Sequence, residues 1–230
     1  MKNCLLLFLF FFIVIQCLGQ DTVAVKNKLS DSLTERFYVL KSNPAIRQGP
    51  YMALLNRKKL IARGHYQNGK KNGVWQFFDT GGKMVERYDY DRKKFNYEAP
   101  LYESADFSYL FDDSLKIGTR VTRPLKVGGI YYGFISYLNI FQVPFDTYDV
   151  DTDAFEANIE LLISPMGRLA DYHVRLTSAQ YDYDHIFKMD INLFSEEDRI
   201  FKPATINGVP AMSRIIIKCY VSPYGKLDFY

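Results

Sequence analysis

An internal repeat with a period of 24 residues constrains the fold of this chain more than any other feature of its sequence. Gly49-Pro50-Tyr51 aligns with Gly73-Val74-Trp75, and Lys59-Leu60-Ile61 aligns with Lys83-Met84-Val85. Each unit has two apolar runs divided by a turn, which in the second unit is Asp79-Thr80-Gly81-Gly82. Periods of this size are typical of stacked supersecondary units, and apolar runs around a Gly-rich turn are typical of β-hairpins. The sequence therefore predicts β-hairpin repeats over residues 46–95.

The most specific motif of the repeat joins the two units. It reads Gly64-His65-Tyr66-Gln67-Asn68-Gly69-Lys70-Lys71-Asn72-Gly73-Val74-Trp75-Gln76-Phe77-Phe78-Asp79. This order of Gly and Tyr, Asn-Gly-Lys, Gly-x-Trp, aromatics and Asp resembles the MORN-type repeat of bacterial envelope proteins. The first unit is degenerate, because Leu54-Leu55-Asn56-Arg57 replaces the aromatic run. The resemblance implies an interaction scaffold. Some relatives are called antitoxins, an intracellular role that conflicts with the N-terminal segment described next.

The N-terminal segment, residues 1–19, has the form of a secretory signal peptide. Lys2 precedes an unbroken apolar run from Leu5 to Ile15, and Cys17-Leu18-Gly19 places small residues before a cut after Gly19. The apolar run is shorter than the roughly 18 residues that a spanning helix usually needs. We therefore expect export to the periplasm or cell envelope. An uncleaved membrane anchor is the alternative.

Two further segments flank the repeats. Residues 20–45 are predicted to form a leader helix, since Leu29, Leu33, Phe37 and Leu40 fall at helical spacing and Asn43-Pro44 is a stop signal. Residues 96–117 are acidic and aromatic without a clear period, and we interpret them as a connector between domains.

The C-terminal part, residues 118–230, reads as a small α+β unit. Apolar alternation predicts strands near residues 155–163 and 170–177 and a final strand over residues 214–221. Acidic residues from Asp182 onward predict a helix that begins there. A short helix is also expected through Tyr132, Ile135 and Leu138.

The order of these elements resembles the C-terminal domain of the TonB family over about 110 residues. The shared signals, quoted in chain order, are Arg123-Pro124-Leu125-Lys126-Val127-Gly128-Gly129, the short helix, Pro144, Pro203-Ala204 and Asn207-Gly208-Val209-Pro210. The resemblance implies a three-stranded antiparallel sheet with one or two helices. Together with the β-hairpin repeats, it gives α+β as the expected fold class of the chain.

The final strand is the predicted partner-binding element. Arg214, Ile216, Lys218 and Tyr220 alternate with an apolar face. If the strand lies at a sheet edge, its backbone could accept an extended peptide by β-augmentation, the mode in which the TonB domain captures a segment of an outer-membrane receptor. The opposite interpretation is that Arg214 and Lys218 protect the edge from pairing.

The charge pattern leaves two interpretations of the turn lysines open. The net charge is only +3, which argues against a nucleic-acid partner. Lys58-Lys59, Lys70-Lys71 and Arg92-Lys93-Lys94 cluster at turns. They are either solvated turn residues or a basic face for an anionic lipid or glycan.

Residues with catalytic potential do not form a recognisable motif. His65, His173 and His185 lie in three different segments, and no phosphate-binding glycine loop or nucleophile motif is present in the sequence. An acidic cluster from Asp182 to Asp190 is either a cation site or the acidic start of a helix. Cys219 is expected in the core as a small apolar residue, with a reactive thiol as the alternative.

These observations predict a non-enzymatic protein of the cell envelope without a cofactor or metal. It would bind a protein, such as an outer-membrane receptor, or a cell-wall component through the TonB-like domain and the β-repeats. The alternative is a TonB-type energy transducer for outer-membrane transport, tethered by an uncleaved N-terminal segment. Whether the chain forms a homodimer is left open.

Overall fold

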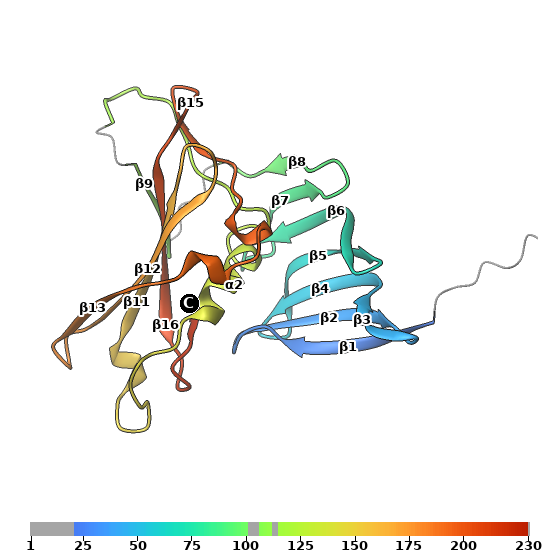
Figure 1. The fold of residues 1–230 in the computed structure, drawn as a ribbon, viewed down its shortest axis with the longest axis horizontal. Coiled ribbons are helices and arrows are strands. Elements are labelled where there is room, and N and C mark those ends of the chain that lie inside the picture. Colours follow the sequence, from blue (N-terminus) through green and yellow to red (C-terminus); the bar gives the residue numbers. More distant parts are fainter. Residues whose placement is uncertain (1–20, 101–105, 112–114, 230) are drawn as a thin grey trace, which may run out of the picture.

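The chain folds into three antiparallel β-sheets with very little helix (Figure 1). A computed structural model describes residues 21–100, 106–111 and 115–229. The predicted signal peptide lies outside the described residues. Eight strands form the first sheet, which we call the repeat sheet, and six form the second, which we call the C-terminal sheet. A third, small sheet has three strands.

The repeat sheet is an antiparallel meander that contains both repeat units. Its strands follow the order β1-β2-β4-β5-β6-β7-β8, and β3 pairs with β2 beside this path. The expected hairpins of the repeat are present as β4–β5 and β6–β7. The strands are β1 (Thr22–Lys28), β2 (Leu33–Leu40), β3 (Asn43–Arg47), β4 (Gly49–Leu55), β5 (Lys59–Gln67), β6 (Lys70–Phe78), β7 (Met84–Asp89) and β8 (Lys94–Glu98).

The repeat motif is explained by one turn and one close contact. Asn68 and Gly69 have positive φ angles of 50° and 79° between β5 and β6, as a two-residue hairpin turn requires. Trp75 on β6 is fully buried, and its ring lies against the backbone of Gly64 on β5. A Cβ atom on Gly64 would lie 2.1 Å from that ring, so the spacing of glycine and tryptophan within the motif is a packing requirement.

The prediction of a leader helix over residues 20–45 is wrong. These residues form β1 and β2 and part of β3. Leu33 and Phe37 do lie on one buried face. A spacing of four residues has this result in a strand as well as in a helix, because every second side chain of a strand points to the same face. Glu35 and Val39 complete the same buried row of β2, which shows the alternation of a strand rather than a helical stripe.

The C-terminal sheet has the order β13-β12-β11-β16-β17, with β9 also paired to β16. Its inner face is covered by a short helical segment, η1 (Tyr132–Phe134) followed by α2 (Ile135–Ile140), where a helix was expected. Tyr172 of β12 donates a hydrogen bond of 2.7 Å to the carbonyl of Tyr137 in α2. The strands are β9 (Phe107–Phe111), β11 (Glu156–Ile163), β12 (Leu169–Ser178), β13 (Tyr183–Lys188), β16 (Ser213–Val221) and β17 (Leu227–Phe229).

The expected α+β fold class and three-stranded C-terminal sheet are therefore wrong. The predicted helix from Asp182 is strand β13, which pairs with β12. Asp182 itself has a φ of 49° in the tight turn between the two strands, where Asp tolerates the left-handed region. The predicted connector, residues 96–117, contributes β9 to the same sheet. The protein is mostly β, with one short helical segment in its described part.

The small sheet and three single turns complete the C-terminal part. The small sheet has the order β10-β14-β15. Its strands are β10 (Val121–Thr122), β14 (Ala204–Ile206) and β15 (Val209–Ala211), and the turns of 3-10 helix are η2 (Thr152–Ala154), η3 (Ile191–Leu193) and η4 (Glu197–Arg199). No helix within the described ranges is long and apolar enough to cross a membrane.

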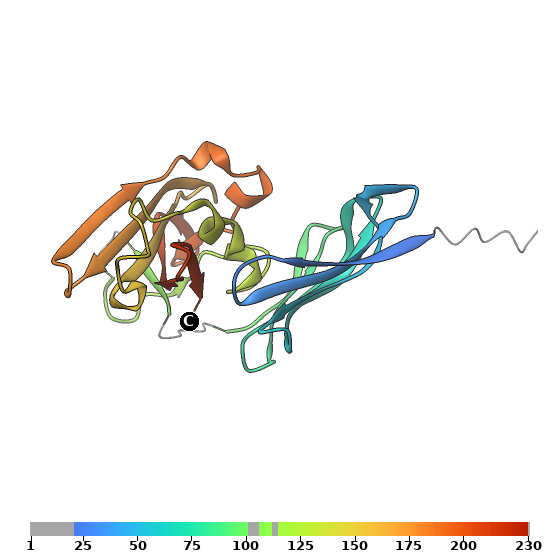
Figure 2. The ribbon, with the colours of Figure 1, turned by 90° about the horizontal axis from the view of Figure 1, so that it is seen from below.

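One apolar core joins the two large sheets. The C-terminal part lies on one side of the repeat sheet, which projects from it (Figure 2). Leu33, Leu55 and Ile61 of the repeat sheet belong to the same buried cluster as the inner face of the C-terminal sheet. The face of the repeat sheet that meets this core is called its inner face below, and the opposite face its outer face.

Candidate functional site

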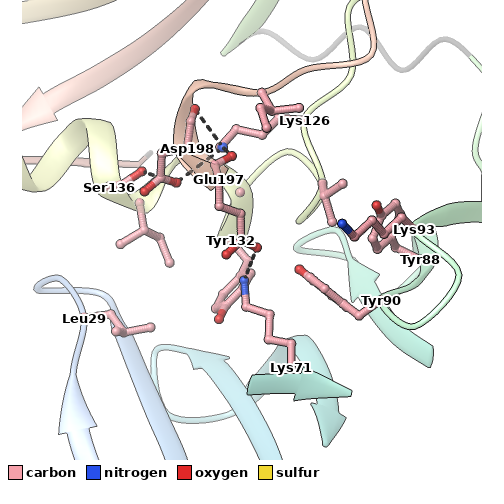
Figure 3. A pocket seen from close by; sticks show the side chains of 14 residues that line it. Leu29, Lys71, Tyr88, Tyr90, Lys93, Lys126, Tyr132, Ser136, Glu197 and Asp198 are labelled. Carbon is pink, nitrogen blue, oxygen red and sulfur yellow. Dashed lines mark hydrogen bonds and ion pairs between the residues drawn. The ribbon is translucent and has the colours of Figure 1, made fainter. Parts of the chain in front are cut away.

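A cleft of about 680 Å³ lies where the repeat sheet meets the C-terminal part (Figure 3). Its volume is within the range of small-ligand pockets, and most such pockets are lined by apolar and aromatic side chains with a few polar groups. This cleft follows that pattern. Its lining residues are Leu29, Lys71, Tyr88, Tyr90, Lys93, Lys126, Val127, Tyr132, Gly133, Ile135, Ser136, Glu197, Asp198 and Ile200.

Tyrosines from both parts of the molecule form the aromatic wall of the cleft. Tyr132 of η1 stacks on Phe77 of the repeat sheet, with the ring centroids 5.7 Å apart. Tyr90 follows β7 and meets Trp75 edge to face at 5.6 Å. Burial raises the pKa of Tyr90 and of Tyr132 above the usual range, so both hydroxyls stay neutral at physiological pH.

Lys71 bridges the two parts across the cleft. It lies in β6 immediately after the Asn-Gly turn, and its Nζ lies 2.8 Å from Oε1 of Glu197 in η4. The same ammonium lies 5.0 Å from the ring centroid of Tyr90 and 5.9 Å from that of Tyr132. Such contacts are attractive because the ring faces carry negative potential. Lys71 therefore covers the aromatic faces of the wall.

Lys126 binds the η4 turn through its buried ammonium group. Its side chain is only 4% exposed, and its Nζ donates to the carbonyls of Glu197 at 3.3 Å and Asp198 at 3.0 Å. The Asp198 carboxylate lies 3.3 Å away. Burial lowers the pKa of Lys126, and the nearby Asp198 opposes that shift. Ser136 also donates to Asp198. The acidic rim of the cleft is thus held in position by a buried cation.

Glu86 of β7 binds the glycine pair Gly128-Gly129, which precedes η1, and so attaches this segment to the repeat sheet. Its carboxylate is buried and accepts hydrogen bonds from the backbone N–H groups of Gly128 at 2.9 Å and Gly129 at 3.2 Å. Gly129 has a φ of 66°, and a Cβ there would lie 3.1 Å from Phe77, so this position favours glycine. Burial raises the pKa of Glu86 to about 7, although the two amides oppose the shift.

The chemistry available to a ligand differs between the wall and the mouth of the cleft. Lys71 and Lys126 are already engaged by Glu197 and Asp198. Lys93, in the turn between β7 and β8, is exposed and takes part in no ion pair recorded among the described residues. Ile200 also lines the cleft and is 48% exposed. The open groups are therefore one cation and a set of apolar side chains.

The four predicted binding residues do not reach this cleft. Arg214, Ile216, Lys218 and Tyr220 lie on the face of β16 that points away from the core. The prediction that β16 is an edge strand is wrong, because β16 pairs with β11 on one side and with β9 and β17 on the other. Between β9 and β17, the N–H of Lys218 donates to the carbonyl of Asp106. This backbone has no room for an added peptide strand.

The other predicted reactive groups have structural partners. Asp184 binds Arg175 through two hydrogen bonds of 2.9 Å and 2.6 Å across the β12–β13 hairpin. No group of three or more His, Cys, Asp or Glu is placed to hold a metal within the described residues. Cys219 is fully buried, as expected of a core residue, and burial raises the pKa of its thiol.

Sequence patterns pointed to only part of the cleft. The repeat and its basic turns contain Lys71, Tyr90 and Lys93. The sequence therefore indicated that these residues lie at or near the surface of the repeat sheet. Tyr132 was expected in a helix, and nothing in the sequence marked Glu197 or Asp198. These residues meet only because η4 packs against the repeat sheet.

No family model, curated protein or solved structure matches this chain.

Proposed function

We propose that this chain is a non-enzymatic binding protein of the cell envelope, exported by its N-terminal segment, that captures a segment of a protein partner in the cleft. The observation that carries the proposal is the cleft itself, which has apolar walls, an open cation at its mouth and the size of a ligand pocket. The signal-peptide pattern and the two resemblances to interaction domains support an envelope location and a binding role.

The wall of the cleft favours a peptide over a sugar. Sugars bind proteins largely by stacking on open aromatic faces, but Lys71 already covers the rings of Tyr90 and Tyr132. The remaining apolar surface, from Leu29, Val127 and Ile200, suits an apolar side chain. Lys93 would then pair with an adjacent carboxylate. The preferred segment is a large apolar residue next to an acidic one.

This proposal moves the binding role away from β16. Peptide addition to that strand is not part of it, because the backbone of β16 is already paired on both sides. The segment would instead bind through its side chains, with the hydrogen bonds of both sheets left intact.

A random peptide library displayed on phage tests the proposal. The library would be selected on the chain without residues 1–19, and enriched peptides would be synthesised and titrated by calorimetry. We expect enrichment of sequences that combine a large apolar and an acidic residue. We expect Ile200→Asp and Lys93→Glu each to weaken binding of these peptides roughly tenfold, about the effect of one lost apolar or ionic contact.

Two matched substitutions serve as controls. Ile186→Asp changes an isoleucine on β13 whose exposure, 57%, is close to the 48% of Ile200. Lys94→Glu changes the lysine next to Lys93, and neither control residue lines the cleft. Both should leave the affinity unchanged. The proposal fails if no sequence is enriched, or if the cleft variants bind the selected peptides as tightly as the controls do.

A further inference from the structure

A single row of side chains crosses the outer face of the repeat sheet from one edge to the other. Residues that are directly opposite in an antiparallel register lie on the same face of a sheet. Successive registers along the path β1-β2-β4-β5-β6-β7-β8 link one residue of each of these strands in such a row; β3 lies beside the path and contributes none. In strand order these residues are Lys26, Arg36, Met52, Arg63, Gln76, Arg87 and Tyr97.

The row lies opposite the aromatic inner face. Trp75 and Phe77, which flank Gln76 on β6, are fully buried toward the C-terminal part. Lys26, Arg36 and Arg63 are exposed. From β2 to β7 the arginines occupy alternate strands, so neighbouring arginines are about 10 Å apart, twice the spacing of adjacent strands. Arg63 and Arg87 are equivalent positions of the 24-residue repeat, which explains the regularity.

The cations of the row lack acidic partners within the described part of the chain. None of Lys26, Arg36, Arg63 and Arg87 takes part in an ion pair recorded there. On the same face of the sheet, the carboxylate nearest to the row is that of Asp89, two residues beyond Arg87, and it accepts hydrogen bonds from the amides of the following turn. Arg87 has a buried Nε without a hydrogen-bond partner. The row is thus a line of uncompensated positive charge.

We propose that this row, which we call the basic row, binds a linear acidic polysaccharide laid across the strands. The proposal is independent of the cleft, which lies on the inner side of the sheet. Each guanidinium would pair with one acidic group of the glycan. Met52, which lies between Arg36 and Arg63 and is 38% exposed, would contact the apolar face of a sugar ring between them.

The spacing and shape of the row favour a glycan over the other large polyanions. Duplex DNA carries one charge per 1.7 Å of axis and each strand one per 3.4 Å, whereas the row offers one arginine per about 10 Å. A flat membrane also fits poorly, because adjacent strands rotate by about 20–25° and the outer cations therefore point in different directions. A flexible chain with sparse charges can follow both the spacing and the twist.

Fluorescence anisotropy with a labelled hyaluronan octasaccharide tests this proposal, since that glycan carries a carboxylate on every second sugar. The test variant is Arg36→Gln/Arg63→Gln/Arg87→Gln. The matched control is Lys58→Gln/Lys59→Gln/Lys83→Gln, which removes the same charge from positions in or next to turns, beyond the row. Because each exposed ion pair contributes modestly, we expect the test variant to bind roughly tenfold or more weakly and the control to bind within about twofold of the unmodified chain.

Further measurements distinguish an acidic glycan from a neutral sugar and from other polyanions. Binding of the octasaccharide should weaken as salt is added, because exposed pairs are screened. A neutral chitin oligosaccharide should not compete. The proposal is overturned if the test variant and the control behave alike, if the neutral sugar competes, or if an oligothymidylate or phosphatidylglycerol vesicles bind the row more tightly than the glycan. Thermal unfolding of each variant verifies that it is folded.

Discussion

At the scale of single residues, the junction between the two sheets depends on a few buried charged groups. Glu86 and Lys126 are both nearly inaccessible, yet each has polar partners that satisfy it. Glu86 receives two backbone amides of the glycine pair, and Lys126 donates to two carbonyls of η4. A buried charge without such partners would be very costly, so these groups specify where the C-terminal part attaches.

Glu86 is expected to make the stability of the fold depend on pH. Burial raises its pKa from 4.5 to about 7, while Arg123 partly opposes and Glu98 adds to the shift. A raised pKa means that the folded state holds the proton more tightly. The stabilising contribution is therefore fully present below pH 4.5 and is lost as pH rises to about 7, a change on the order of 3 kcal/mol.

Thermal unfolding across this pH range checks the prediction. Glu86→Gln cannot ionise, so the variant should lack the decline in unfolding free energy that the unmodified chain shows between these pH values. The Gln variant should be less stable than the unmodified chain at low pH, because the amide offers one acceptor oxygen to the N–H groups of Gly128 and Gly129, where the protonated carboxyl group offers a carbonyl and a hydroxyl oxygen. Glu156→Gln, at an exposed position of β11, should keep the decline. An unchanged pH profile in Glu86→Gln would contradict the assignment.

At the scale of elements, short segments distant in sequence hold the two parts together. β17 ends next to the turn between β1 and β2, and the link is Asp228. Its carboxylate accepts hydrogen bonds from the Oγ atoms of Ser30 and Ser32 and from the N–H of Ser32, at 2.7–3.0 Å. Asp228 is 1% exposed. The turn that begins the repeat sheet is therefore fixed by the last described strand of the chain.

Asp228→Ala is expected to destabilise the protein by about 1–3 kcal/mol, because it leaves buried donors of the β1–β2 turn without an acceptor. Denaturant titration measures the change. Asp149→Ala, at an exposed loop position, is the matched control and should change stability by less than about 0.5 kcal/mol. Equal effects of the two substitutions would show that the link at Asp228 contributes nothing.

At the scale of the whole molecule, the repeat sheet is not an independent module. Its inner face belongs in part to the same core as the C-terminal sheet, through Leu33, Leu55 and Ile61. Tyr132 from the C-terminal part also lies among the aromatic rings of the repeats. A sheet with one apolar face must cover that face, and here the C-terminal part supplies the cover.

We therefore expect the two sheets to unfold together. Trp75, the only tryptophan of the chain, reports on the repeat sheet, whereas far-ultraviolet circular dichroism reports on both sheets. The two signals should give coincident transitions in guanidinium chloride, as two-state unfolding requires. Transitions with separate midpoints would show that the repeat sheet and the C-terminal part are independent domains.

Elements whose signals are local could be predicted from the amino-acid sequence. The hairpins of the repeat, the segment Tyr132–Ile140 and the strands β11, β12 and β16 follow from glycine turns and periodicity, both of which act within a few residues. The remaining features, namely the strand β2, the central position of β16 and the cleft, depend on contacts between distant segments. A four-residue spacing fits a strand as well as a helix, so β2 could not be recognised. The central position of β16 depends on β9 and β17, and the cleft depends on contacts such as that of Lys71 with Glu197, 126 residues apart. Pairing between distant segments cannot be recognised from local periodicity. For this reason the sequence predicted a binding site at a sheet edge, whereas the structure has its candidate site at the junction of the two sheets.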